Sequence, residues 1–208
     1  MLAWPPAWSG PRFAAYAPAI ARLAAWPRWP TVAELDRALA DGLGAAPVRL
    51  VEQVADTAPY ELAIADQGCV PTRADNAHDL WNAIVWATFP TAKRALTARL
   101  ADYQRVRHAG GAKLPGGRAP AHDRLALLDE GGLIAVGGRA VVFGHAILEH
   151  AARGAIAVRA AVLRLPAEVP WRAAAVDAAL AAALVDGAAV APGSGVAIDD
   201  AALAPWDP

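Results

Sequence analysis

The stretch Val70–Lys93 reads VPTRADNAHDLWNAIVWATFPTAK, and the rest of the chain can be arranged around it. Its apolar residues recur at helical spacing, so that Leu80, Ile84 and Val85 share one stripe. This pattern predicts a helix over Ala77–Phe89 with one buried face. The stretch also holds the densest group of polar side chains in the chain, so we expect it to contribute to a functional site.

The residues at both ends of this helix agree with its expected length. Asn76 is a favourable N-cap residue, and Asp79 three residues later can return a hydrogen bond in the manner of a capping box. The Asp79 carboxylate also lies in the first turn, where the helix dipole favours a negative charge. Pro90 either ends this helix or opens a following one at its first position, and we expect that second helix over Thr91–Val106.

A second stripe of the same helix is polar. His78, Asn82 and Trp86 are four residues apart, so an imidazole, an amide and an indole share one ridge. Together with Asp79 they are candidates for a pocket in which His78 acts as an acid, a base or a metal ligand. The structural alternative is that Asp79 stabilises the start of the helix, while His78 and Asn82 hold the preceding loop in place.

The segment VVFGHAILEHAARG predicts another helix, with Gly154 just beyond its last turn. His145 and Glu149 are four residues apart within it and share a face, which suits an acid–base couple or half of a metal site. No third ligand follows at a diagnostic spacing, so the metal signal is weak. The alternative is an intrahelical hydrogen bond, or a histidine that ties the helix to its neighbour.

An acidic, glycine-containing turn separates two apolar runs in the second half of the chain. Leu125–Leu128 and Leu133–Val136 flank Asp129, Glu130 and two glycines, a pattern that predicts a β-hairpin. In this interpretation Asp129 and Glu130 are turn residues rather than a catalytic pair of carboxylates.

Three further segments have the composition of strands or helices. Val48–Val54 and Tyr60–Ala65 are rich in strand-forming residues, and Ala155–Leu165 is the longest strand candidate. Trp171–Leu184 is mostly alanine and predicts a final helix. With the hairpin, these segments predict an α+β fold, in which helices pack on a small, mostly antiparallel sheet.

Length and composition limit the class of protein. The 208 residues suit a single domain over 1–208, and a hydrophobic fraction of 56% excludes a largely disordered chain. A formal net charge of −1 without a basic block disfavours nucleic-acid binding, and one cysteine excludes an internal disulfide. No segment is typical of a signal peptide or membrane span, so we expect a soluble protein of the cytoplasm. Nothing in the sequence indicates an oligomeric state.

Three motifs together resemble those of a known family. They are VPTR…NAHDLWNAIVW…FP with the following lysine, then RAP…DRLALLDEGG, then FGHAILE. On these motifs the chain resembles, over nearly its whole length, the bacterial domain of unknown function family numbered 3025. The resemblance implies no activity, only a set of typical motif positions: Arg73, Asn76, His78, Asp79, Asn82, Lys93, Arg118, Asp123, Asp129, Glu130, His145 and Glu149.

The functional hypothesis is that the two polar helix faces meet. In a hydrolase or lyase, with or without a metal, His145 would be the base and Glu149 its orienting partner. His78 would be the acid or a second ligand, and Asn82 would hold a substrate oxygen. The remaining candidates, for substrate binding, are Arg73, Trp86, Lys93, Arg118 and Asp123. The alternative is a non-catalytic module that binds a small molecule or a protein, with the polar ridge buried as a network between helices.

Overall fold

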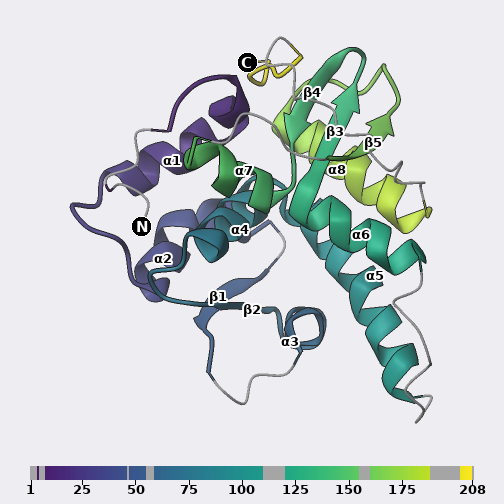
Figure 1. The fold of residues 1–208 in the computed structure, drawn as a ribbon, viewed down its shortest axis with the longest axis horizontal. Coiled ribbons are helices and arrows are strands. Elements are labelled where there is room, and N and C mark those ends of the chain that lie inside the picture. The colour runs from purple at the N-terminus through teal and green to yellow at the C-terminus, as the bar shows by residue number, and fades with distance from the viewer. Residues whose placement is uncertain are drawn as a thin grey trace.

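The structure, a computed structural model, has an α+β fold in which short strands accompany many helices (Figure 1). It describes residues 4, 8–45, 47–54, 59–109, 120–154, 160–187 and 202–207. Within them the elements are η1 Pro11–Tyr16, α1 Ala17–Ala24, α2 Val32–Leu43, β1 Arg49–Glu52, α3 Tyr60–Gln67, β2 Cys69–Thr72, α4 Ala77–Thr88, α5 Pro90–Ala109, α6 Pro120–Gly131, β3 Gly132–Val136, β4 Arg139–Val142, α7 His145–Ala152, β5 Ala161–Leu165 and α8 Ala173–Val185. Arg118 and residues 155–159 of the expected strand lie outside the described residues.

Helix α4 lies in the interior, in contact with η1, α1, α2, α5 and α7 (Figure 1). The apolar stripe formed by Leu80, Ile84 and Val85 is buried, which confirms the prediction for this helix. Trp81 and Trp86 are fully buried as well, so the helix is enclosed on more than one side. Its polar ridge therefore faces other helices, and α7 covers the first turn.

Helix α5 follows α4 directly and begins at Pro90, so of the two alternatives for this proline the structure has the start of the second helix. Asp177 of α8 accepts hydrogen bonds from the backbone N–H groups of Thr91 and Ala92, at 3.1 and 2.8 Å, and so caps α5 from another helix. Helix α5 is long but carries charges, whereas α8 is apolar but has only 13 residues. Among the described residues, no helix combines the length and the apolar character that crossing a bilayer requires.

The strands form two small sheets, so the prediction of one mostly antiparallel sheet is wrong. Strands β1 and β2 pair in parallel, and the second sheet has the order β4-β3-β5. In that sheet β3 is antiparallel to β4 and parallel to β5. The parallel pairs arise because helices separate the paired strands in sequence: α3 leads the chain from β1 back to the start of β2, and α7 lies between β4 and β5.

The strand predicted over Tyr60–Ala65 is also wrong, because this segment begins α3. A short apolar run suits a strand or a helix equally, and here good helix formers such as Glu61 and Leu62 follow Pro59. Gly68, with φ of 66°, ends the helix in the left-handed conformation.

The predicted hairpin is wrong in its first strand. Leu125–Leu128 belongs to α6, and β3 pairs instead with β4. The turn between these strands is Gly137-Gly138, whose φ values of 53° and 86° suit a two-residue hairpin. Asp129 and Glu130 consequently lie at the end of α6, not in a hairpin turn.

Candidate functional site

Two histidines from different helices meet where α4 contacts α7. The Nε2 atoms of His78 and His145 are 3.0 Å apart, and the two ring centroids are 4.4 Å apart. His78 is in the first turn of α4, and His145 is the first residue of α7. The structure thus brings together the two polar helix faces that the sequence singled out.

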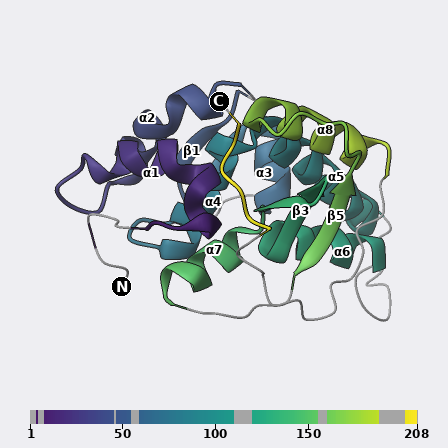
Figure 2. The ribbon, with the colours of Figure 1, turned by 90° about the horizontal axis from the view of Figure 1, so that it is seen from above.

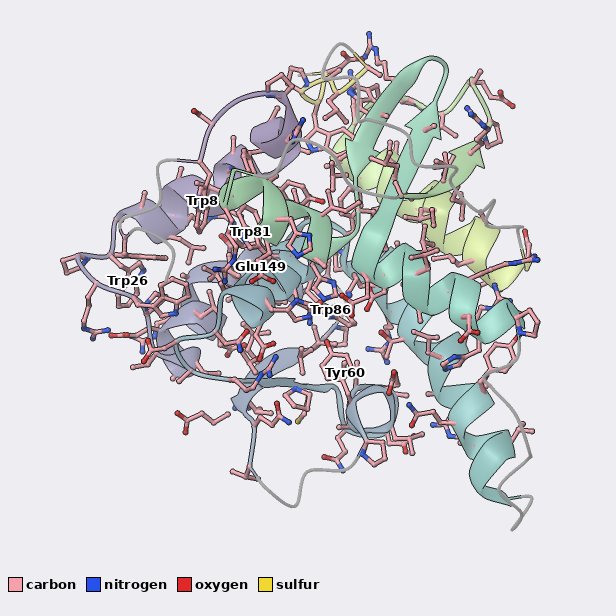
Figure 3. All side chains as sticks on the ribbon, in the orientation of Figure 1. Trp8, Trp26, Tyr60, Trp81, Trp86 and Glu149 are labelled. Carbon is pink, nitrogen blue, oxygen red and sulfur yellow. The ribbon has the colours of Figure 1, made fainter. Side chains whose placement is uncertain are left out.

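Glu149 reaches across to His78 rather than back to His145. Its Oε2 atom is 3.2 Å from His78 Nδ1, and Figure 3 shows Glu149 projecting from α7 over α4. Arg153 holds the other carboxylate oxygen through Nε and Nη2, at 3.1 and 2.8 Å. A carboxylate on Nδ1 keeps a hydrogen on that nitrogen and leaves the Nε2 lone pair of His78 directed at His145. Glu149 therefore orients His78, not His145 as the sequence hypothesis had it.

Glu130 completes the cluster, although the sequence placed it in a turn. Its Oε2 atom lies 3.8 Å from His78 Nε2 and 3.5 Å from His145 Nε2. Burial raises the pKa of Glu130, and the neighbouring Asp129 carboxylate adds to this effect. The sequence signal that could have identified Glu130 as a site residue was its place among the typical motif positions of the family.

A close approach of backbones places Glu130 beside His145. The N–H groups of Phe143 and Gly144 donate to the Gly132 carbonyl, at 2.8 and 2.9 Å. A Cβ atom on Gly144 would lie 2.3 Å from Gly132 N and 2.5 Å from the Glu130 carbonyl oxygen. Only glycine can therefore occupy position 144 while α7 starts directly against the end of α6.

His145 is buried and uncharged at neutral pH. Burial lowers the pKa of His145 to about 3, an effect larger than the opposing attraction of the Asp129 carboxylate. Its Nδ1 atom is also buried and makes no hydrogen bond of normal geometry within the described residues. A neutral imidazole has a hydrogen on one ring nitrogen and a lone pair on the other. The Nε2 atom of His145 is the ring nitrogen that faces His78.

Asn82 and Lys93 form a buried network beside the histidines. The Lys93 ammonium, 1% exposed, donates to Asn82 Oδ1 at 2.9 Å and pairs with Asp129. Asn82 Nδ2 donates to the Tyr60 hydroxyl at 2.6 Å, and Lys93 lies 5.5 Å from the centre of the Trp86 ring. Tyr60 reaches this network from α3 (Figure 3). The side chains expected to contact substrate here contact one another.

Burial disfavours the charged form of Asp129, but Lys93, with smaller contributions from His145 and His78, outweighs it, so the pKa of Asp129 is lowered. Asp129 therefore enters the network as a carboxylate paired with an ammonium. Because Glu130 is the next residue, this pair also fixes the end of α6 from which Glu130 projects.

Asp79 pairs with Arg73. The Asp79 carboxylate accepts from the Arg73 backbone N–H at 2.7 Å, from Nε at 2.9 Å and from Nη2 at 2.8 Å. Asn76 caps α4 by accepting from the Asp79 N–H at 3.0 Å, as predicted. The expected return bond of a capping box is replaced, because the Asp79 side chain ties the loop at Arg73 instead.

Of the two remaining substrate-binding candidates, Arg118 lies outside the described residues and Asp123 is not brought to the cluster. Asp123 is on α6, seven residues before Glu130 and hence roughly 10 Å away along the helix axis. Its carboxylate is 3.9 Å from His122 Nδ1.

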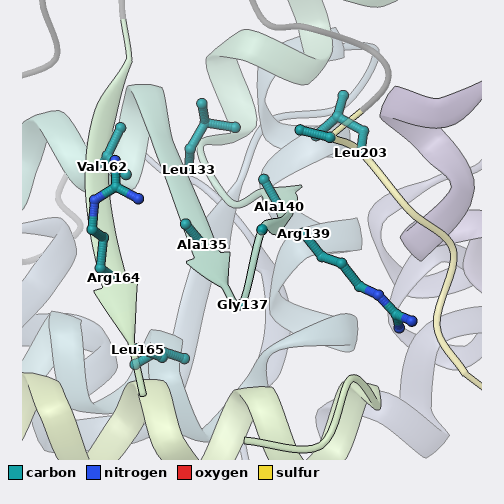
Figure 4. A pocket seen from close by; sticks show the side chains of 11 residues that line it. Leu133, Ala135, Gly137, Arg139, Ala140, Val162, Arg164, Leu165 and Leu203 are labelled. Atoms are coloured by element: carbon teal, nitrogen blue, oxygen red, sulfur yellow. The ribbon is translucent and has the colours of Figure 1, made fainter. Parts of the chain in front are cut away.

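An apolar cavity of about 290 Å³ lies apart from the histidine cluster, against β3, β4 and β5, with Arg139 and Arg164 among its lining residues (Figure 4). None of the histidine cluster lines it.

His78, His145 and Glu130 are the set of described residues whose spacing suits a metal ion. One nitrogen or oxygen atom from each lies within 4.8 Å of the others. The alternative is that the two Nε2 atoms share a hydrogen, with Glu130 as a separate carboxylate. Both arrangements would support proton transfer or the activation of water.

Comparison with known proteins identifies part of the chain. Residues 48–139 match a family model described as "Protein of unknown function (DUF3025)". The comparison found no match among curated proteins and none among solved structures. The matched region includes His78, Lys93 and Glu130, whereas His145 and Glu149 lie beyond its end. The match confirms the resemblance carried by the sequence motifs: residues 48–139 of this chain are similar to the DUF3025 family of proteins of unknown function.

Proposed function

We propose that the protein is a hydrolase or lyase whose reaction takes place at the cluster of His78, His145 and Glu130. The observation that carries this proposal is the approach of two imidazole Nε2 atoms to 3.0 Å, with a carboxylate beside both. Side chains of His78 and Glu130 are 33% and 51% exposed, so water and a substrate can reach them. His145 closes the cluster from the inside.

The electrostatics of the pair support a role in proton transfer. Two Nε2 lone pairs facing each other at 3.0 Å would repel, so either one Nε2 carries a hydrogen or a cation lies between them. If it is a hydrogen, the N–H of one ring donates to the lone pair of the other, and the pair can pass a proton to a leaving group. Glu130 is then the exposed carboxylate that can take a proton from water or substrate.

Arg73 supports a substrate that carries negative charge. Its side chain is 53% exposed and donates hydrogen bonds to the Asp79 carboxylate, which anchors it. These hydrogen bonds are the main cause of the raised pKa of Arg73, and the nearby Glu149 carboxylate raises this pKa further. An anchored guanidinium at the edge of the cluster suits a carboxylate or phosphate group on a small molecule.

A second candidate function is a non-catalytic binding module. The observation in its favour is the buried, mutually satisfied network of Lys93, Asn82, Tyr60 and Asp129, which needs no substrate to explain it. In this case ligand binding would occur without turnover.

The test is a screen of the purified protein against ester, amide, phosphoester and 2-hydroxy-acid substrates. For any activity found, we expect His78→Gln and Glu130→Gln to reduce kcat/KM by at least about 100-fold, the usual contribution of an acid or base. His150→Gln, an exposed histidine of the same α7 helix, is the control. Activity that survives in both cluster variants would place the reaction elsewhere, and binding without turnover would favour the second function.

A further inference from the structure

We propose that His78 Nε2, His145 Nε2 and Glu130 Oε2 bind one divalent zinc-type cation. Two imidazole nitrogens and one carboxylate oxygen form a common ligand set for catalytic Zn²⁺. These ligands come from three separate elements: α4, the end of α6 and the start of α7.

The geometry of the three atoms fits an ion closely. They form a triangle with sides of 3.0, 3.5 and 3.8 Å. From these sides the circumscribed radius is about 2.0 Å, so an ion at about 2.1 Å from each atom would sit roughly 0.6 Å above their plane. That is close to the position of zinc above three corners of a tetrahedron, and it requires no movement of the backbone.

A shared proton explains the cluster less completely. A proton between the rings would account for the 3.0 Å approach of the two Nε2 atoms. It would leave Glu130 Oε2 at 3.5 and 3.8 Å from them, beyond hydrogen-bond distance. Atoms that share one ion are expected at these separations, so a cation accounts for all three positions at once.

The groups behind the ligands are those of a metal site. His78 is oriented through Nδ1 by Glu149, which Arg153 holds in turn. A carboxylate behind a metal-binding histidine fixes the ring and increases its basicity as a ligand. The carboxylates of Glu130 and Glu149 would together balance the charge of a divalent ion.

The site has the features of a catalytic metal centre rather than a structural one. A structural zinc ion is usually enclosed by four protein ligands, whereas this cluster supplies three. The two partly exposed ligands, His78 and Glu130, lie on the solvent side, so a water molecule can take the fourth position. The catalytic role of the ion rests on the proposed function, but its binding does not.

The test is metal binding by the whole purified chain after treatment with a chelator. The protein is dialysed against Zn²⁺, its metal content is measured by mass spectrometry, and affinity is measured by competition with a chromophoric chelator. We expect one zinc per chain, and a rise in Tm with zinc because the ion binds the folded state. Glu149→Gln should weaken affinity by roughly 10- to 100-fold, and His78→Gln or Glu130→Gln by at least as much.

His150→Gln and Glu52→Gln, both at exposed positions, are the matched controls and should bind zinc as the wild type does. Circular dichroism checks that each variant is folded, and Glu130→Gln keeps the test decisive if a histidine variant fails to fold. Substoichiometric zinc in the wild type, or equal affinity in Glu130→Gln and Glu52→Gln, would overturn the site. Zinc binding without any turnover would instead overturn only the proposed function, and turnover unaffected by the chelator would overturn only the metal.

Discussion

At the scale of single residues, the buried Lys93 connects the candidate site to the core. Its ammonium lies between Asp129 and Asn82 and has almost no contact with solvent. A buried charge is tolerated only where it is paired and hydrogen-bonded, and Asp129 provides the pair. Since Asp129 precedes Glu130, the Lys93–Asp129 pair helps to set the position of a proposed ligand without contacting a substrate.

We expect Lys93→Met to destabilise the protein by roughly 3–5 kcal/mol, the usual effect of removing one partner of a buried ion pair. Methionine fills a similar volume, so the loss would come mainly from the uncompensated Asp129 carboxylate. The free energy of unfolding in urea measures it, and adding Asp129→Asn should recover part of the loss. If the single variant lost less than about 1 kcal/mol, Asp129 would have to be solvated well enough to need no partner.

Single-residue chemistry was partly predictable from the sequence. His78, His145 and Glu149 stood out because each is a polar residue at a defined spacing in an otherwise apolar helix. Glu130 did not, because a run of Asp, Glu and two glycines suits a turn as well as a helix end. Which side chain orients which histidine depends on the distance between two helices, and a sequence does not contain that distance.

At the scale of elements, the start of α7 decides the geometry of the site. Gly144 packs directly on the backbone at Glu130, Gly131 and Gly132. Because these neighbours are main-chain atoms, they cannot move aside as a flexible side chain could. Helix α7, with His145 at its first position, must shift if position 144 gains a side chain.

We therefore expect Gly144→Ala to cost about 1–3 kcal/mol of stability and also to weaken zinc binding, because it separates His145 from Glu130. The comparison variant is Gly154→Ala at the other end of α7, where φ is 87° and no atom lies within 4 Å of a new Cβ. That variant should lose stability through backbone strain while keeping the site intact. Denaturation and chelator competition on both variants separate the two effects, and equal zinc affinity in the two would contradict this account.

The first turn of α2 gives a prediction about pH. Thr31 and Glu34 form a capping box, and Arg28 donates two hydrogen bonds to the Glu34 carboxylate. The Arg28 side chain, followed by the Thr31 N–H, lowers the pKa of Glu34 to about 2 from 4.5. A lowered pKa in the folded state means that this stabilisation is fully present above about pH 4.5 and is lost as pH falls through 2.

We expect the stability difference between wild type and Glu34→Gln to be constant above pH 5 and to shrink steadily as the pH falls from about 4.5 to 2. Thermal denaturation at several pH values measures it. Arg28→Gln should move the loss of stability to higher pH, because the main cause of the shift is then gone. A difference that stays constant down to pH 2 would show that the Glu34 charge contributes nothing to the cap.

Elements were predictable where a local signal and a long pattern agreed. Helices α4 and α5 combine caps, a proline start and apolar stripes over several turns, and both were located correctly. The segment that forms α3 and the segment that ends α6 are short apolar runs beside turn-forming residues, which carry no periodicity of their own. Both α3 and α6 pack against α5, and this tertiary contact is not visible in a short stretch of sequence.

At the scale of the whole molecule, residues 202–207 connect parts of the chain that are far apart in sequence. The backbone N–H of Ala140 donates to the Ala202 carbonyl at 2.7 Å, and that of Asp207 donates to the Trp171 carbonyl at 2.9 Å. The Trp206 indole donates to the Ala15 carbonyl of η1 at 3.1 Å. Figure 2 shows this segment running between the N-terminal helices and the elements of the second sheet.

Trp206 is the apolar anchor of this connection, since its ring packs on Trp171 and Phe89 with centroids 4.9 and 5.9 Å apart. Truncating a fully buried tryptophan costs about 3–5 kcal/mol, so we expect a somewhat smaller loss of about 2–4 kcal/mol from the partly buried Trp206→Ala. The proposed ligands belong to α4, α6 and α7, and Trp206 is not a residue of any of these helices. Zinc affinity, measured well below the unfolding temperature, should therefore stay at the wild-type value while Tm falls. An affinity that fell together with Tm would mean that the proposed site forms only when residues 202–207 hold the two ends of the fold together.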